Sequence, residues 1–235
     1  MKIAISQPTF LPWAGYFALI DHVDQFVFLD NVQFVKRSWM QRNKIKIQEY
    51  EKLISIPVHS KNKFNQLIHE VEIDYRHFDH KDLIITLEYN YKKSKFFNLY
   101  FDKIKNIFEK KFNKLADLNI NLIMEISKIM GINTNKKLAS SYNIKFKEKN
   151  IELLRKICVI ENAKEYISTI GAKDYMNEIQ KFKDTDIKIS FFSYDQNFYN
   201  QLGKEFINNL SIIDLLFNEG PEAINIIRKN FKLIN

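Results

Sequence analysis

The fold is decided by residues 2–31, KIAISQPTFLPWAGYFALIDHVDQFVFLDN. The apolar run of residues 2–6 predicts a central strand that ends at Gln7-Pro8, because proline has no N–H to donate to a strand ladder. Residues 13–23 place their apolar side chains at helical spacing, and residues 25–29 predict a second strand. Strand, crossover helix and strand form the unit of a parallel α/β sheet, whose ligands bind beyond the carboxyl ends of the strands.

The rest of the chain alternates between strand and helix patterns. Residues 44–48 and 53–58 predict a hairpin joined by a polar turn, and residues 71–73 predict a further strand. Helices are expected at 80–91, 96–112, 119–130, 151–160, 173–182, 212–217 and 222–230, and strands at 166–169 and 187–194. We therefore predict an α/β fold with a mainly parallel sheet, an N-terminal strand-helix-strand unit, a hairpin and a helical middle layer.

Length and composition favour one domain. The 235 residues are 46% apolar, which is ample for a packed interior, and no Pro/Gly-rich linker or internal repeat divides them. We expect a single domain over 1–235, with a helical layer or insertion at about 80–131. Stability needs no disulfide, because the single cysteine, Cys158, lies in an apolar run where a thiol serves as a small hydrophobe.

Targeting signals are missing from the pattern. After Met1-Lys2 the apolar stretch is too short for a signal peptide, and no run approaches the roughly 20 apolar residues of a membrane span. We expect a cytoplasmic protein with no membrane span.

The net charge of +8 does not indicate a nucleic-acid reader. The excess is nearly all lysine and is spread along the chain, whereas such readers concentrate Arg and Lys in one stripe. The densest cluster, residues 103–114, interleaves lysine with apolar residues at helical spacing and is typical of the solvated face of an amphipathic helix. No nucleic-acid partner is expected.

Two polar and aromatic segments follow the first two predicted strands. Prolines at 8 and 12 make the first segment a stiff, shaped loop, whose candidate substrate-binding residues are Gln7, Trp13 and Tyr16. The second segment, 30–43, collects a carboxylate, amides and two arginines, and Arg binds phosphate or carboxylate with a planar fork. Its candidate substrate-binding residues are Gln33, Lys36, Trp39, Arg42 and Asn43. The alternatives are a loop that only packs over the sheet and a solvated loop.

A third cluster lies near the C-terminus. Tyr199 and Gln201 are polar candidates for substrate binding, and Asp214 stands in a mostly apolar helix. A buried carboxylate is costly without a partner, so we expect Asp214 to pair or to cap, with ligand binding as the alternative.

Several catalytic signatures are absent from the sequence. It has no phosphate-cradling glycine loop, no GxSxG nucleophile elbow, no Cys/His zinc spacing and no HExxH. We therefore expect no metal and no tightly bound cofactor.

The ordered blocks of sequence resemble one known family. Gln7-Pro8 with Leu11-Pro12-Trp13 and Gly15-Tyr16, then residues 26–30, 32–34 and Arg42-Asn43, are similar to the opening signature of the WbqC-like proteins. Further similar blocks are His80, Ser140-Ser141, Tyr199 with Gln201, and residues 210–220. Thr9-Phe10 departs from the family pattern, where an aromatic residue often precedes Leu-Pro.

The resemblance implies a role in the synthesis of bacterial O-antigen (lipopolysaccharide) and related surface glycans. Its gene contexts imply an N-acyl or N-aminoacyl transferase that acts on the amine of a nucleotide-linked amino sugar. The acyl donor would be a thioester on coenzyme A or on an acidic acyl carrier protein, which a basic surface would attract. The alternative is a non-catalytic adaptor that binds a sugar nucleotide within a glycosylation complex.

Acyl transfer to an amine needs a base, for which two residues are candidates. His80 matches the family pattern and precedes a predicted helix. Histidine as a residue type has an unperturbed pKa of about 6.5, which suits proton transfer at neutral pH. Asp30 is the alternative base. A helix-start or surface histidine is the structural interpretation of His80, and the other four histidines have no comparable support.

Overall fold

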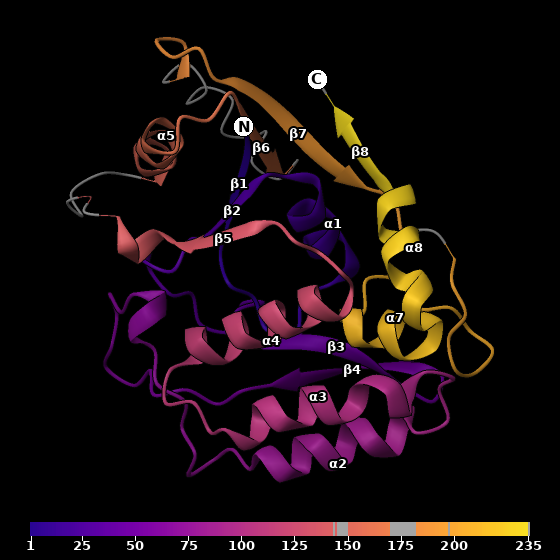
Figure 1. The fold of residues 1–235 in the computed structure, drawn as a ribbon. Coiled ribbons are helices and arrows are strands. Elements are labelled where there is room, and N and C mark those ends of the chain that lie inside the picture. The colour runs from indigo at the N-terminus through magenta and orange to yellow at the C-terminus, as the bar shows by residue number, and fades with distance from the viewer. Residues whose placement is uncertain (143, 145–149, 170–181, 197, 235) are drawn as a thin grey trace.

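A twisted six-stranded sheet forms the centre of the molecule (Figure 1). The computed structural model describes residues 1–142, 144, 150–169, 182–196 and 198–234. The sheet order is β5-β2-β1-β6-β7-β8, and every neighbouring pair is parallel except β7 with β8. Its strands are β1 (Lys2–Ser6), β2 (Gln25–Phe28), β5 (Asn135–Leu138), β6 (Glu165–Thr169), β7 (Lys188–Tyr194) and β8 (Phe231–Ile234). The predicted mainly parallel α/β fold is confirmed.

The strand order reverses direction at β1. From β1 the chain proceeds outward through β2 to β5, and it then returns to the other side of β1 as β6. Ile3 is consequently paired with Gln25 of β2 and with Tyr166 of β6. In open α/β sheets, ligands generally bind beyond the carboxyl ends of the strands at such a reversal.

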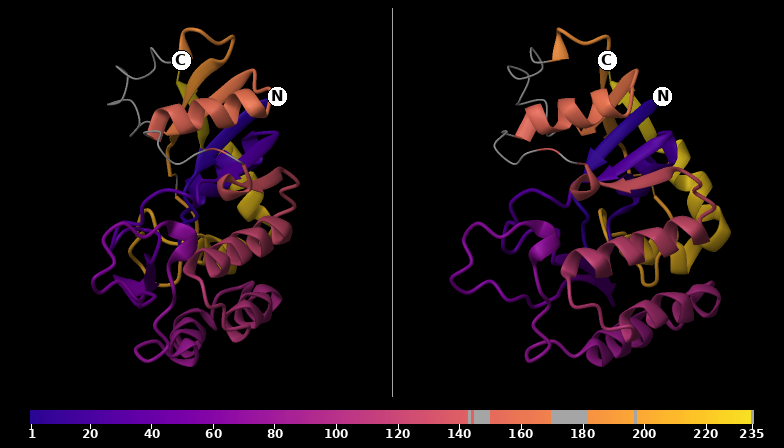
Figure 2. Two further views of the ribbon diagram at one scale, coloured as in Figure 1. Left: turned by 90° about the vertical axis from the view of Figure 1, so that its left-hand side faces the viewer. Right: turned by 60° about the vertical axis from the view of Figure 1, so that its left-hand side comes forward.

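Helices cover both faces of this sheet (Figures 1 and 2). The described α-helices are α1 (Ala14–His22), α2 (His80–Tyr91), α3 (Phe97–Glu109), α4 (Leu115–Ile129), α5 (Asn150–Ile160), α7 (Ile212–Glu219) and α8 (Ala223–Lys229). Short 3₁₀ turns occupy η1 (Ile68–Glu70), η2 (Ala139–Ser141) and η5 (Gly220–Glu222). None of the helices in the described ranges has the length and apolar composition needed to cross a membrane.

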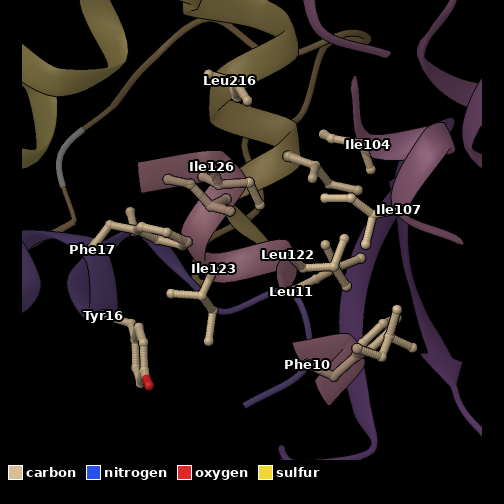
Figure 3. Close-up of a cluster of buried hydrophobic side chains, with 14 of the residues drawn as sticks. Phe10, Leu11, Tyr16, Phe17, Ile104, Ile107, Leu122, Ile123, Ile126 and Leu216 are labelled. Atoms are coloured by element: carbon tan, nitrogen blue, oxygen red, sulfur yellow. The ribbon is translucent and has the colours of Figure 1, made fainter. Parts of the chain in front are cut away.

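The side chains of β1 alternate between the two faces of the sheet, and each face packs against a separate hydrophobic core. Ala4 faces the larger core, which holds the buried sides of α1, α3, α4 and α7, whereas Ile3 and Ile5 face a smaller core under α5. Figure 3 shows Leu11, Ile104 and Ile126 meeting in the larger core. Cys158 is buried in the smaller core, where burial raises the pKa of its thiol to about 12.

The predicted hairpin is present with shifted ends. It pairs β3 (Arg42–Ile47) with β4 (Tyr50–Ser55) in antiparallel register, whereas the sequence pattern placed the second strand at 53–58. The tight turn falls at Gln48 and Glu49, and Gln48 adopts a positive φ of 53°. The predicted turn covered residues 49–52, but Tyr50, Glu51 and Lys52 form the start of β4, whose side chains are largely exposed.

Two further differences from the expectations concern strands. Residues 71–73 form isolated bridges, Val58 with Ile73 and Glu72 with Lys114, and not a strand. Two strands of the sheet, β5 and β8, were not predicted. The helix expected at 173–182 lies almost entirely outside the described residues.

Candidate functional site

The two N-terminal polar segments lie side by side at the carboxyl ends of β1 and β2. The backbone N–H of Phe10 donates to the carbonyl of Trp39 at 2.9 Å, which joins the segments directly. The side-chain amide of Asn43, 5% exposed, donates to the carbonyls of Phe10 at 3.0 Å and Leu11 at 2.7 Å. Asn43 therefore holds the first segment in shape.

Helix α4 supplies a second clamp on the same two segments. Asn119 is completely buried, and its Nδ2 donates to the carbonyl of Pro8 at 2.9 Å and to that of Met40 at 2.7 Å. One amide thus satisfies one carbonyl from each segment, which fixes their spacing. Sequence reasoning missed Asn119, because the residues that it joins are 111 and 79 positions away.

The start of α1 stiffens the first segment further. The Tyr16 hydroxyl donates to the carbonyl of Gln7 at 2.9 Å, and burial raises the pKa of this phenol well above its ordinary value. The indole of Trp13 lies over Gly15 so closely that a Cβ there would come within 2.4 Å of the ring. Trp13 also makes an edge contact with Tyr194 at 5.2 Å between ring centroids. Tyr16 and Trp13 are therefore held by contacts within the fold.

Asp30 ties the end of β2 to the turn that follows β5. Its carboxylate, 2% exposed, accepts from the backbone N–H of Ser140 at 2.8 Å and from the Ser140 hydroxyl at 2.6 Å. The neighbouring amide of Asn31 donates to the carbonyl of Ala139 at 3.2 Å. The Asp30 side chain thus positions η2 beside the sheet edge.

His69 lies on the main chain of Asp30. Its backbone N–H and its ring Nδ1 both lie 2.9 Å from the carbonyl oxygen of Asp30. A carbonyl oxygen only accepts, so the neutral imidazole carries its proton on Nδ1 and presents the lone pair of Nε2. Among the described residues, Nε2 has no hydrogen-bond partner. His69 therefore has the geometry of a general base at the sheet edge.

His80 occupies a different part of the molecule, at the start of α2. Its ring is largely buried, and Nδ1 lies 3.5 Å from the Asp79 carboxylate. It lines an open hollow of about 750 Å³ together with Arg76, His77, Lys81 and Lys111. No residue of the two N-terminal segments lines this hollow. The two base candidates, His80 and Asp30, are therefore not brought together.

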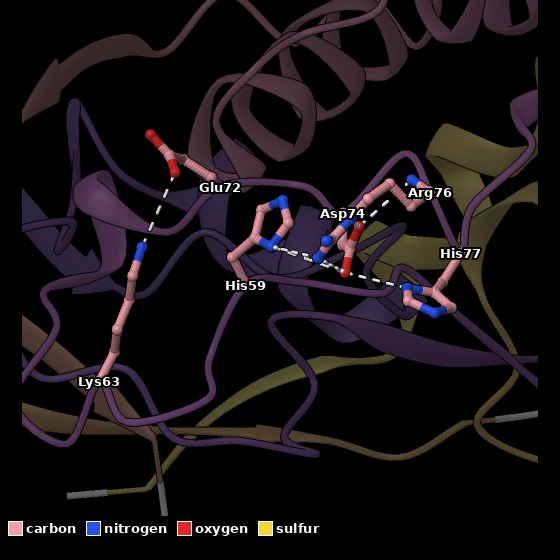
Figure 4. Close-up of polar contacts among 6 residues, drawn as sticks. All are labelled: His59, Lys63, Glu72, Asp74, Arg76 and His77. Carbon is pink, nitrogen blue, oxygen red and sulfur yellow. Dashed lines mark hydrogen bonds and ion pairs between the residues drawn. The ribbon is translucent and has the colours of Figure 1, made fainter.

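A charged cluster around Asp74 borders the same hollow through Arg76 and His77 (Figure 4). The Arg76 guanidinium contacts Asp74 through Nε at 3.0 Å and through Nη2 at 3.1 Å, and His77 Nδ1 lies 3.0 Å from the same carboxylate. The Arg76 guanidinium and the His77 ring hold the pKa of Asp74 well below its usual range. Arg76 is thus committed to Asp74, which limits what else it can bind.

The third predicted cluster is a buried network. Asp214, 1% exposed, accepts from the hydroxyls of Tyr91 and Tyr199, each at 2.9 Å. Burial raises the pKa of Asp214 to about 6, although both hydroxyls and Lys46 favour its charged form. Gln201 accepts from Lys46 Nζ at 3.5 Å and donates to the carbonyl of Ile207 at 2.9 Å. These contacts fit the structural pairing expected of Asp214.

The remaining candidates of the second segment point in several directions. Gln33 donates to the carbonyl of Phe64 at 2.9 Å, and Lys36 and Trp39 are exposed on the following turn. Arg42 is half-buried, and its Nε is a buried atom with no hydrogen-bond partner among the residues that the structure describes. Because Asn43 points at the first segment and strand side chains alternate, Arg42 faces the other side of the hairpin. The predicted Arg42 and Asn43 pair is thus divided between two faces.

A metal ion would need several suitable side chains close together within residues 1–142, 144, 150–169, 182–196 and 198–234. Within those ranges no group of three or more His, Cys, Asp or Glu side chains is arranged to hold a metal ion.

Comparison with known proteins places this architecture in a family. The WbqC-like protein family matches residues 7–226, which include both N-terminal segments, His69, Ser140 and Asp214. An uncharacterized protein of Mycobacterium tuberculosis is 36% identical over 229 residues, covering 97% of each chain. No solved structure matches this chain. The protein belongs to the WbqC-like protein family.

Proposed function

We propose that this protein is a transferase of surface-glycan synthesis that joins an acyl or aminoacyl group to the amine of a nucleotide-linked amino sugar. The family membership supports the glycan context, and the reversal of strand order at β1 supports a nucleotide-type ligand beyond the carboxyl ends of β1, β2 and β6. The observation that carries the proposal is His69, whose Nδ1 bonds to the carbonyl of Asp30 and whose Nε2 has no hydrogen-bond partner among the described residues.

The reaction requires one proton acceptor and one site for negative charge. Nε2 of His69 takes a proton from the sugar ammonium, and the freed amine attacks the thioester carbonyl. The C–N bond forms, the C–S bond breaks, and the imidazolium returns its proton to the departing thiolate. The second proton that the nitrogen loses on becoming an amide passes to water. Polar donors at the edge, among them the Gln7 amide, would stabilise the developing oxyanion.

His69 replaces Asp30 and His80 as the preferred base for geometric reasons. Both carboxylate oxygens of Asp30 already accept from Ser140, and its side chain is 2% exposed. His80 lines the hollow beside α2, which no residue of the two N-terminal segments reaches. Asp30 instead acts as the positioning residue, because its carbonyl fixes the tautomer of His69.

The test has two stages and a matched control. A thermal-shift screen against UDP- and dTDP-linked amino sugars identifies the acceptor, because a ligand of the folded state raises Tm. Thiol release from acyl coenzyme A or an acylated carrier protein then measures transfer. His69→Gln should lower kcat by about 100-fold or more, which is the usual contribution of a general base. His77→Gln, an exposed histidine outside the edge, should retain activity.

Two other outcomes would contradict the proposal. Loss of turnover in His80→Gln with retention in His69→Gln would move the active site to the hollow beside α2. A thermal shift with a sugar nucleotide but no turnover with any thioester would favour the non-catalytic adaptor.

A further inference from the structure

Two exposed turns project from the same end of one antiparallel pair. The N–H of Phe34 donates to the carbonyl of Gln66 at 2.8 Å, and that of Ile68 donates to the carbonyl of Val32 at 3.0 Å. This register continues into the turn at 35–39 on one strand and the turn at 61–65 on the other. The segment lies at one side of the molecule, next to α4 (Figure 2).

The tips of these turns carry large apolar side chains in solvent. Val35 is 59% exposed, Trp39 is 51% exposed and Phe64 is 79% exposed. Gln33 links the two turns, because its Nε2 donates to the carbonyl of Phe64 at 2.9 Å. Exposed tryptophan and phenylalanine together are unusual on a surface that meets only water.

The charge of the same turns is entirely positive. Residues 31–42 and 59–66 contain no Asp or Glu. Lys36, Arg37 and Lys61 are exposed, and within the described ranges none of them forms an ion pair. Lys63 is the exception, since it lies 3.7 Å from Glu72. The basic aromatic surface is defined by Val35, Lys36, Arg37, Trp39, Lys61 and Phe64.

We infer that the basic aromatic surface docks the protein on a membrane that contains anionic phospholipids. Tryptophan favours the headgroup region because its ring is apolar and its N–H is polar, and lysine and arginine are attracted by the negative surface potential. The surface is compact, so it would anchor peripherally and would insert only the tips of the two turns. It also lies on the segment that follows β2, so docking would hold the sheet edge near the bilayer.

Vesicle binding tests this inference without any sugar substrate. The purified chain is sedimented with vesicles of phosphatidylcholine alone or of phosphatidylcholine mixed with phosphatidylglycerol. We expect binding to the mixed vesicles that weakens as salt is added, because salt screens exposed charges. The double variant Lys36→Glu, Arg37→Glu should reduce partitioning by about 25-fold or more, since each basic residue contributes about fivefold.

The helix α2 offers matched controls. Lys92→Glu, Lys93→Glu changes the net charge equally at another exposed site, and Tyr89 is 70% exposed there. These controls, including Tyr89→Ser, should bind like the parent, whereas Trp39→Ser should bind weakly. Equal loss in the α2 variant, or equal binding to phosphatidylcholine alone, would overturn the inference.

Fluorescence gives a second measurement on the unaltered protein. The chain has two tryptophans, and Trp13 is half-buried against Tyr194. Anionic vesicles should shift the emission to shorter wavelength, and Trp39→Phe should abolish that shift. An emission unchanged by vesicles would contradict insertion of Trp39. Vesicle binding and thiol release with a soluble sugar nucleotide are separate readouts, so the failure of one leaves the other intact.

Discussion

The carboxylate of Asp30 receives both the backbone N–H and the hydroxyl of Ser140, at 2.8 and 2.6 Å, across 110 residues of sequence. This relationship closes the edge of the sheet, because it fixes the turn after β5 against the end of β2. The same residue fixes His69 through its carbonyl. The proposed site thus depends on Asp30 for its geometry.

Removing the Ser140 hydroxyl should loosen this edge. A hydrogen bond to a charged group contributes about 1.5 to 3 kcal/mol, and partial exposure places Ser140→Ala near the lower value. Urea unfolding measures the change. Ser141→Ala is the matched control, because its hydroxyl donates to the neutral carbonyl of Leu138 at 2.7 Å and its loss should cost less. Equal effects of the two substitutions would show that the Asp30 contact contributes nothing special.

Gly15→Ala should destabilise the protein although alanine favours helices. The added Cβ would lie 2.4 Å from the Trp13 ring, and such overpacking costs about 1 to 3 kcal/mol. In the Trp13→Ala background the obstacle is gone, and the same substitution should stabilise α1 by up to about 1 kcal/mol. A double-mutant cycle measured by thermal unfolding checks the change of sign. The same sign in both backgrounds would contradict the ring position.

Asp214 should make stability fall as pH rises from about 4 to about 6. Its folded pKa of about 6 exceeds its ordinary value of 3.8, so between these values the folded state binds more protons than the unfolded state. Asn at this position does not ionise. The free energy of unfolding of Asp214→Asn, relative to the parent, should therefore rise by about 2 kcal/mol over that interval. A difference independent of pH would show that burial does not raise this pKa.

Asp74 should behave in the opposite way. Its pKa is depressed, chiefly by the hydrogen bonds from Arg76, so its stabilising contribution is present above the ordinary carboxyl pKa and is lost as the solution is acidified. Arg76→Leu should raise the pKa of Asp74 toward its ordinary value, which NMR titration of the carboxyl carbon detects. His77→Gln should raise it less. An unchanged titration in Arg76→Leu would mean that the guanidinium fork does not form in solution.

The elements that could be predicted from the sequence are those whose burial leaves a clear run or spacing of apolar residues. β1 and β2 are buried on both faces and read as short apolar runs, and the helix between them is apolar and buried from Ala14 to Ile20. β5 could not be recognised this way, because the four residues Asn135-Lys136-Lys137-Leu138 form a largely exposed edge strand. Its pairing with β2 is determined by tertiary contacts that local patterns do not encode.

The position of the two N-terminal segments could be predicted from the sequence, but the contacts of their side chains could not. Placing polar residues after parallel strands located the two N-terminal segments, and the structure lays these segments side by side. The contact between the His69 ring and Asp30 could not be predicted, because it joins residues 39 positions apart in the chain. Asn43 has a polar side chain typical of a binding site, but its amide donates to the carbonyls of Phe10 and Leu11.

The most direct test of the proposed site at His69 is to follow the NMR signals of the histidine rings while the acceptor binds. The chain has five histidines, so ring resonances labelled with ¹⁵N are few, and His69→Gln assigns the decisive one. On titration with a UDP- or dTDP-linked amino sugar, the account predicts that the His69 resonances shift while those of His77 and His80 stay in place. Shifts of His80 and His77 with an unmoved His69 would contradict it and would place the ligand beside α2.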